Sequence, residues 1–160
     1  MSAHTERASV IAVDAVADLP SAIGRTATGE WFAIDQQRIS DFADATLDHQ
    51  WIHLDAERAA TGPFGATVAH GFLTLSLLPH LAASLMEVGG VALAMNYGLD
   101  RVRFLAPVPA GSRVRATTEL TGVEDTPRGV RAASTVTIEL EGSDKPALVA
   151  QTLAVYVPES

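Results

Sequence analysis

The stretch from Ala66 to Gly90 (ATVAHGFLTLSLLPHLAASLMEVGG) is the most continuously hydrophobic part of the chain. Its length favours a helix over a strand, and the pair Gly89-Gly90 supplies a stop signal at its C-terminal end. Because leucine and phenylalanine side chains surround nearly the whole circumference, we expect this helix to be buried on most sides. Pro79 lies inside the run and removes one helical hydrogen bond, which bends a helix.

After Gly90 the pattern changes to partial alternation with many β-branched residues, which is typical of strands. Turn residues such as Pro109-Ala110-Gly111 and Pro127-Arg128-Gly129 separate the runs. Consecutive strands with short turns form an antiparallel sheet, so we expect an α+β domain whose sheet wraps one long central helix. The four predicted strands cover residues 91–108, 112–125, 129–142 and 147–157.

Shorter elements precede the long helix. Residues 29–37 have the pattern of a short strand, and residues 39–47 have helical spacing with Ser40 as the expected N-cap. Asp55 is the expected cap of a second short helix, and a loop follows at residues 62–65.

The chain has 160 residues, with no internal repeat and no linker composition. This length predicts one domain spanning residues 1–160. The first 28 residues are rich in alanine and contain Pro20 and Gly24, and we expect them to form an N-terminal arm.

Composition narrows the possible functions. Hydrophobic residues make up 48% of the chain and charged residues 19%, as in a compact globular protein. The absence of cysteine excludes disulfides, thiolate metal sites and cysteine nucleophiles, and a cytoplasmic location is the simplest interpretation. The N-terminus lacks the pattern of a signal peptide, and no stretch has the length and apolarity of a membrane span. The net charge of −8 argues against a nucleic-acid partner.

One local charge pattern departs from this acidic balance. Arg101, Arg103, Arg113 and Arg115 lie within fifteen residues, and a spacing of two places each pair on one face of a strand. We expect either an arginine strip that binds a small anion or a solvated strand edge.

Candidate chemistry lies between the short helices, in Asp48-His49-Gln50-Trp51-Ile52-His53. A carboxylate and an imidazole held against apolar neighbours can share one water, with the acid taking a proton. Capping and surface hydrogen bonding are the structural alternative for Asp48 and His53. A metal site formed with His49 and Asp55 is a third hypothesis, but no further ligand pattern accompanies it, and we expect no metal.

Three blocks of the sequence resemble the MaoC-like dehydratases, and within them the (R)-specific enoyl-CoA hydratases (hydratase 2) and the nodulation protein N-like subgroup. The stretch from Asp48 to His53 resembles the family's Asp-x-Asn-Pro-x-His motif. AHGFLTLSL is similar to the His-Gly start of its central helix, and RVRFLAPVPAGSRV is similar to its Arg-Phe-x-x-Pro-Val-x-x-Gly signature. This chain departs from the motif at Gln50-Trp51, where the family has Asn-Pro.

The resemblance implies a hot-dog fold and the reversible hydration of trans-2-enoyl-CoA to (R)-3-hydroxyacyl-CoA. It implies Asp48 and His53 as catalytic residues that grip one water, with Gln50 in place of the asparagine that positions it. Gly71 has no side chain to block the thioester oxygen, and N–H groups at a helix N-terminus favour an oxyanion. The chemistry needs no cofactor.

The remaining assignments concern substrate and assembly. Coenzyme A carries phosphates, which gives Arg101 and Arg103 a partner. The expected acyl pocket contains Trp51 and Phe72, together with Phe42 and Phe64. The resemblance implies a homodimer whose two sheets join.

The other histidines have structural interpretations. We expect His49 to face solvent, His70 to cap or hydrogen-bond the turn before Gly71, and His80 to lie in the core or an interface. His4 belongs to the arm.

Two other functions remain open. A hot-dog thioesterase commonly carries its acid on or beside the central helix, where Glu87 is the only candidate. A non-catalytic subunit that binds acyl groups is the second alternative.

Overall fold

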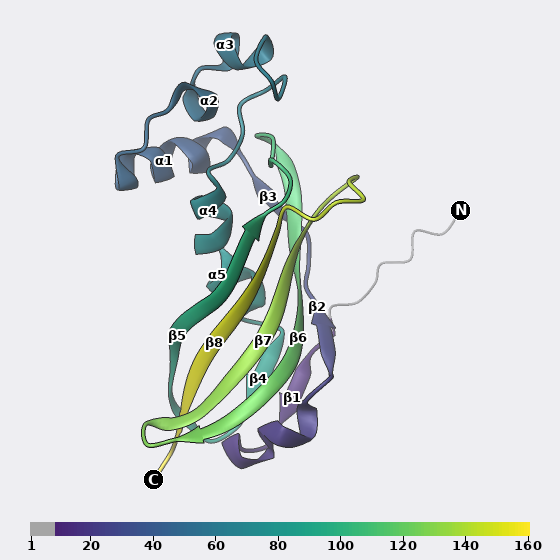
Figure 1. The fold of residues 1–160 in the computed structure, drawn as a ribbon, viewed down its shortest axis with the longest axis vertical. Helices are drawn as coiled ribbons and strands as arrows, with labels where there is room; N and C mark the ends of the chain where they lie inside the picture. Colours follow the sequence, from purple (N-terminus) through teal and green to yellow (C-terminus); the bar gives the residue numbers. More distant parts are fainter. Residues whose placement is uncertain (1–8) are drawn as a thin grey trace, which may run out of the picture.

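A strongly curved antiparallel sheet is the main element of the computed structural model, which describes residues 9–160 (Figure 1). The strand order is β2-β6-β7-β8-β5, and β3 also pairs with β6. The predicted series of four antiparallel strands in an α+β domain is confirmed. The long strands are β5 (Val91–Phe104), β6 (Ser112–Thr126), β7 (Gly129–Leu140) and β8 (Leu148–Pro158), and the short ones are β2 (Thr26–Thr28) and β3 (Phe32–Ile34).

The predicted long helix is two short helices, α4 (Gly71–Ser76) and α5 (Leu78–Ala82). They break at Leu77, and Pro79 lies in the first turn of α5, where its missing N–H is not needed. The chain then leaves the helix early, because Met86–Val88 forms strand β4 beside β1 (Ile11–Val13). The glycine pair that we expected to end a helix therefore follows a strand.

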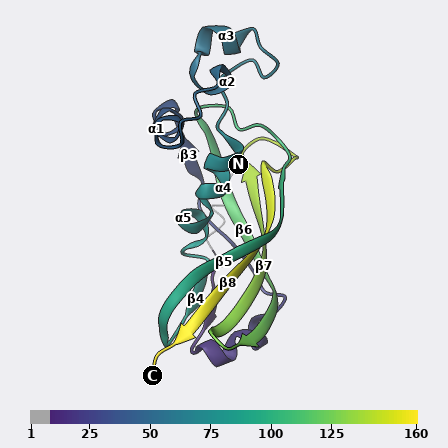
Figure 2. The ribbon, with the colours of Figure 1, turned by 60° about the vertical axis from the view of Figure 1, so that its left-hand side comes forward.

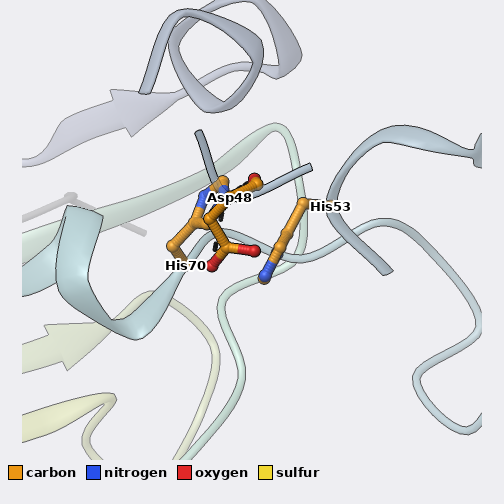
Figure 3. Close-up of side chains that lie close together, drawn as sticks. All are labelled: Asp48, His53 and His70. Carbon is orange, nitrogen blue, oxygen red and sulfur yellow. Dashed lines mark hydrogen bonds and ion pairs between the residues drawn. The ribbon is translucent and has the colours of Figure 1, made fainter. Parts of the chain in front are cut away.

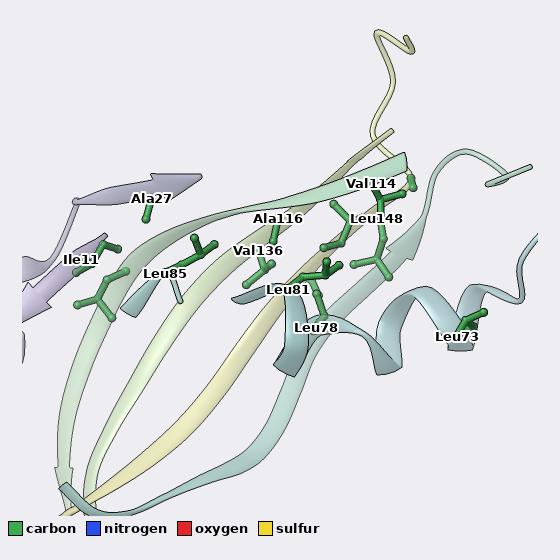
Figure 4. Packing of buried hydrophobic residues seen from close by; sticks show 14 of the residues in the cluster. Ile11, Ala27, Leu73, Leu78, Leu81, Leu85, Val114, Ala116, Val136 and Leu148 are labelled. Carbon is green, nitrogen blue, oxygen red and sulfur yellow. The ribbon is translucent and has the colours of Figure 1, made fainter. Parts of the chain in front are cut away.

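Helices α4 and α5 lie on one face of the sheet, as the rotated view shows (Figure 2). Leu78 and Leu81 of α5 lie near Val114 and Leu148 of the sheet (Figure 4), and Leu73 of α4 belongs to the same buried cluster. Burial is one-sided, and the expectation that the helix is covered on most sides is wrong for this chain. Phe72, for example, is 66% exposed.

Residues 11–28, which we expected to belong to a loose N-terminal arm, instead pack into the domain. Residues 1–8, including His4, lie outside the described part of the chain. The packed segment contains β1, the 3-10 helix η1 (Val16–Ala22) and β2. Ile11 and Leu19 are fully buried in the core cluster. In an alanine-rich segment, these few large apolar side chains do not form a pattern that predicts burial.

Three further helices gather beyond one end of the sheet (Figure 1). They are α1 (Gln36–Thr46), α2 (Trp51–Leu54) and α3 (Ala56–Ala60). Asp35, and not Ser40, caps α1, since its carboxylate accepts from Arg38 N at 2.8 Å. The cap predicted at Asp55 is confirmed, because it accepts from Arg58 N at 3.0 Å.

Replacing Leu19 tests the contribution of the N-terminal segment to the core. We expect Leu19→Ala to lower the free energy of unfolding by about 2–5 kcal/mol, because it leaves a cavity in packed surroundings. Ile23→Ala is the matched control, since Ile23 follows the same 3-10 helix and is 47% exposed. Its effect should stay within about 0.5 kcal/mol. Urea denaturation of both variants measures the difference, and equal small effects would contradict the core assignment.

Candidate active site

The loop that carries Asp48 begins at a strained residue. Helix α1 ends at Thr46, and its C-cap Leu47 is the one non-glycine residue with positive φ, 62°, among residues 9–160. This left-handed conformation costs an L-residue roughly 1–2 kcal/mol. Asp48 follows directly, and its Oδ1 accepts from Gln50 N at 3.4 Å. The conformation of Leu47 therefore sets the direction in which Asp48 leaves the helix.

His53 lies on α2 and is buried, with 6% of its surface exposed. Its Nδ1 donates to the carbonyl oxygen of Val68 at 2.7 Å. A carbonyl can only accept, so Nδ1 carries the proton and Nε2 of the neutral ring presents a lone pair. Burial lowers the pKa of His53 below 6.5, and the positive charge that His70 can carry acts in the same direction. His53 is therefore a neutral acceptor at neutral pH.

His70, at the N-cap of α4, is a third member of the cluster (Figure 3). Its ring stacks on that of His53 with centroids 3.7 Å apart, and its Nε2 donates to the main-chain oxygen of Asp48 at 3.0 Å. We expected His70 to secure the turn before Gly71, but its side chain instead holds the Asp48 loop. Its Nδ1 is buried without a hydrogen-bond partner among the described residues.

Asp48, His53 and His70 each offer one polar atom within 4.8 Å of the others. This spacing lets one water bridge the Asp48 carboxylate and the lone pair of His53. The same three groups form a donor set that suits a metal ion. The further ligands suggested by the sequence lie elsewhere, since His49 Nε2 bonds Asp44 Oδ1 at 2.8 Å and Asp55 caps α3.

Two residues that the sequence did not mark as functional hold the main chain at His53. Gln36 Nε2 donates to the main-chain oxygen of His53 at 2.8 Å, and Thr67 Oγ1 donates to Gln36 Oε1 at 2.6 Å. Both side chains are partly or fully buried. No motif marks them, because a polar residue at the start of a helix usually faces water.

Gly71 and His53 line one cavity of about 280 Å³. Apolar side chains, including Ile52 and Phe64, form much of its wall. A Cβ atom at Gly71 would come within 2.9 Å of the Phe104 ring, so glycine allows this close contact. The predicted oxyanion position and the predicted catalytic histidine therefore share one cavity.

Other predicted site residues lie elsewhere. Gln50 is exposed and its side chain makes no hydrogen bond to the described residues. Trp51 lies under Arg58, whose guanidinium is 4.1 Å from the ring centroid, and Phe72 meets Phe104 edge-on. Neither Trp51 nor Phe72 lines this cavity or the larger one described below, which corrects the predicted acyl pocket.

Of the two further phenylalanines predicted for the acyl pocket, only Phe64 lines the cavity. Phe42 packs instead on His70, with ring centroids 5.0 Å apart. His80 is exposed and lies edge-on to Phe32, with ring centroids 4.8 Å apart.

The four arginines do not form one strip, because β7 and β8 lie between β5 and β6. Arg113 and Arg115 on β6 pair with Glu141 and Glu139, respectively. Arg101 and Arg103 on β5 are exposed and form no ion pair within residues 9–160. They are therefore the two arginines of this set that are available to an anion.

A family model describing a MaoC-like domain matches residues 18–141. The chain belongs to the MaoC-like dehydratase family. 3-Hydroxyacyl-thioester dehydratase Z of Mycobacterium tuberculosis is 57% identical over 146 residues, covering 90% of this chain and 97% of that protein. Nodulation protein N of Rhizobium leguminosarum bv. viciae is 48% identical over 146 residues, covering 88% and 89%. The resemblance inferred from the motifs is confirmed.

The fold is also that of the family. The unliganded R-hydratase PhaJ1 of Pseudomonas aeruginosa superimposes with a TM-score of 0.70 at 24% identity, covering 86% of this chain and 83% of that one. The predicted hot-dog fold is confirmed, and this MaoC-like protein is an enzyme of the hydratase and dehydratase class. None of its helices within residues 9–160 has the length and apolarity to cross a membrane.

Titration of His53 tests the electrostatics of the site. Burial disfavours the charged ring, so we expect its NMR titration midpoint below 6.5. The unfolded chain binds this proton near 6.5 and the folded chain only at lower pH. The contribution of His53 to stability is therefore present above 6.5 and lost as the pH falls through the folded pKa. His53→Gln identifies the resonance by removing it, and a midpoint at or above 6.5 would refute the assignment.

Proposed function

We propose that this MaoC-like protein is an (R)-specific enoyl-CoA hydratase that adds water reversibly to trans-2-enoyl-CoA. The observation that carries the proposal is the placement of the Asp48 carboxylate within 4.8 Å of a buried, neutral His53. Gly71 borders the same cavity as His53. The name of the relative that shares 57% identity, a 3-hydroxyacyl-thioester dehydratase, supports the same reaction in the reverse direction.

In the proposed reaction one water lies between Asp48 and the lone pair of His53 Nε2. As its oxygen bonds to C3 of the enoyl group, the Asp48 carboxylate takes a proton from the water and His53 holds the water in line. The electron pair of the C2–C3 double bond moves toward the thioester carbonyl. The dyad then returns a proton to C2, so that the net change is the addition of one water.

The negative charge that develops on the thioester oxygen needs hydrogen-bond donors. Gly71 begins α4, and the N–H groups in the first turn of a helix point out of its end. The missing side chain leaves room for the thioester against Phe104. We assign Gly71 N–H to this oxygen. Gln50 could reach the water only by turning its exposed side chain toward Asp48.

The remaining substrate contacts follow from exposure and charge. Arg101 and Arg103 present positive charge on the strand that leads to Phe104 in the cavity wall, and we assign them to the phosphates of coenzyme A. We also propose that the enzyme acts in the cytoplasm.

Two observations weigh against the alternatives. A hot-dog thioesterase commonly carries its acid on or beside the central helix, but neither α4 nor α5 contains an acid, and the only candidate, Glu87, lies on β4. A subunit that only binds acyl groups does not need a buried His53 held in one tautomer beside Asp48.

The proposal includes a homodimer joined through β5. This strand is at the sheet edge and exposes Leu93, Met95, Tyr97 and Leu99. An uncovered apolar edge strand invites pairing with another chain. A second copy that places its β5 antiparallel to the first would satisfy the edge and continue the sheet.

Hydration of crotonyl-CoA, followed by loss of enoyl absorbance, tests the reaction. We expect wild type to form the (R)-3-hydroxy product, and Asp48→Asn and His53→Gln each to lose roughly 10²–10⁴ in kcat, the range for general acid–base groups. His49→Gln is the matched control, because His49 is adjacent to Asp48 but pairs with Asp44. Full activity of either dyad variant would overturn the assignment.

Sedimentation of Leu93→Lys tests the dimer. Leu93 is 51% exposed on β5, and a charge there would be desolvated in the proposed interface. We expect this variant to be monomeric at concentrations where wild type is dimeric. Ile23→Lys, at a site 47% exposed, should remain dimeric. A monomeric wild type, or a dimeric Leu93→Lys, argues against pairing through β5.

A further inference from the structure

A second cavity of about 630 Å³ lies between α4–α5 and the inner face of the sheet. Helices α4 and α5 form one wall, and residues of all four long strands complete it. On β5 these include Met95, Tyr97 and Leu99 of the edge that the proposed homodimer covers, so a second copy would border this cavity. Packing voids in proteins rarely exceed the size of a water molecule, whereas ligand sites commonly occupy about 300–1,000 Å³. This space therefore has the size of a binding site.

Hydroxyl side chains interrupt the apolar inner face of the sheet at this cavity. Inward-facing residues alternate along each strand, and most of them are apolar. Each of the three central strands carries one hydroxyl among its buried or cavity-lining residues, namely Thr118 on β6, Ser134 on β7 and Thr152 on β8. The alternate residues around them are apolar: Val114, Ala116 and Leu120 on β6, Ala132, Val136 and Ile138 on β7, and Leu148, Ala150 and Ala154 on β8.

These three hydroxyls are neighbours across the sheet. Ser134 pairs directly with Thr152. Thr118 pairs with Val136, two residues from Ser134 on the same strand, and so it is the diagonal neighbour of Ser134. All three side chains line the cavity. We call this group the hydroxyl rung.

Two members of the rung have no partner. Thr118 is 4% exposed and Ser134 is 8% exposed, yet neither hydroxyl makes a hydrogen bond within residues 9–160. Only Thr152 is engaged, because its Oγ1 donates to the main-chain oxygen of Ser134 at 3.4 Å. Within residues 9–160 the one fully buried side-chain polar atom without a partner is His70 Nδ1, so the hydroxyl oxygens of Thr118 and Ser134 are open to the cavity that they line. The protein itself leaves both hydroxyls unbonded, so both are available to a polar group of a ligand in the cavity.

The two cavities lie along the same strands. Phe104 and Ala147 line the cavity at Gly71, whereas Leu99 and Thr152 line the larger one. The two sites are five positions apart along β5, from Leu99 to Phe104, and five positions apart from Thr152 of β8 to Ala147 just before it, which is about 16 Å of extended chain. A chain that starts at the thioester would have to be long to reach the rung.

We propose that the larger cavity takes the distal part of a long acyl chain that carries an oxygen substituent, a hydroxyl or a keto group, hydrogen-bonded by Thr118 and Ser134. A side-chain hydroxyl both donates and accepts, so it can bind either group. The inference rests on the proposed hydratase function, because the chain enters from a thioester held at Gly71.

The first test compares hydration of trans-2-octenoyl-, dodecenoyl- and hexadecenoyl-CoA with the same three substrates bearing a terminal hydroxyl. We expect the hydroxyl to raise kcat/KM about tenfold at a length that reaches the rung, the value of roughly one hydrogen bond. It should confer no advantage on the octenoyl substrate. A hydroxyl that is neutral or unfavourable at all three lengths overturns the inference.

The second test removes the rung with the double variant Thr118→Val and Ser134→Ala. We expect the preference for the hydroxylated chain to fall to about one, while hydration of crotonyl-CoA is unchanged. Thr135→Val, on the opposite face of β7, is the control and should keep the preference. A preference that survives the double variant refutes the assigned hydroxyls. Ser134→Ala alone replaces the double variant if that protein does not fold.

A binding measurement separates this inference from the proposed reaction. Calorimetry with Asp48→Asn protein gives the ratio of Kd values for the plain and hydroxylated hexadecenoyl-CoA without turnover. If wild type does not hydrate crotonyl-CoA, the proposed function fails, but tighter binding of the hydroxylated chain would still support the cavity assignment. Equal binding, together with normal crotonyl-CoA hydration, would overturn the cavity assignment alone.

Discussion

The buried hydrogen bond from His53 Nδ1 to the carbonyl of Val68 is the interaction on which the site depends. Val68 also donates its N–H to Ile52 at 3.0 Å, and the next residue, Ala69, donates to Val108 at 2.8 Å. The imidazole is thus connected through main-chain bonds to the chain segment that leads into β6. The same burial that strengthens this bond disfavours protonation of the ring. The bond to Val68 therefore determines the position and tautomer of His53, whereas burial keeps the ring neutral by lowering its pKa more than this bond raises it.

The two halves of the dyad are held by different means. His53 is fixed from within the protein, whereas the side chain of Asp48 is 52% exposed. Two constraints hold the Asp48 loop, namely the left-handed Leu47 and the bond from His70 to the Asp48 carbonyl. The strain at Leu47 persists because α1 is anchored in the core by Ile39. This asymmetry leaves the carboxylate open to solvent, whereas most of the imidazole is shielded from it.

The sequence allowed prediction of what depends on local patterns, including the four strands, the cap at Asp55 and the candidate pair Asp48 and His53. It did not reveal what depends on distant partners. The run after Pro79 has helical composition, but pairing of β4 with β1 ends the helix early. The role of Gln36 follows only from its hydrogen bond to the His53 carbonyl in the folded chain, because a single polar residue in a sequence does not identify its partner.

The early end of α5 also explains the larger cavity. A continuous helix through residues 66–90 would have placed further side chains against the sheet, whereas α5 ends at Ala82 and small residues such as Ala83 and Ala132 line the remaining space. Apolar walls alone would favour collapse of this space. The curved sheet resists collapse because its backbone bonds fix the curvature along β6, β7 and β8. In the proposed site, hydroxyls at one level of the cavity would distinguish ligands by where along their length an oxygen lies.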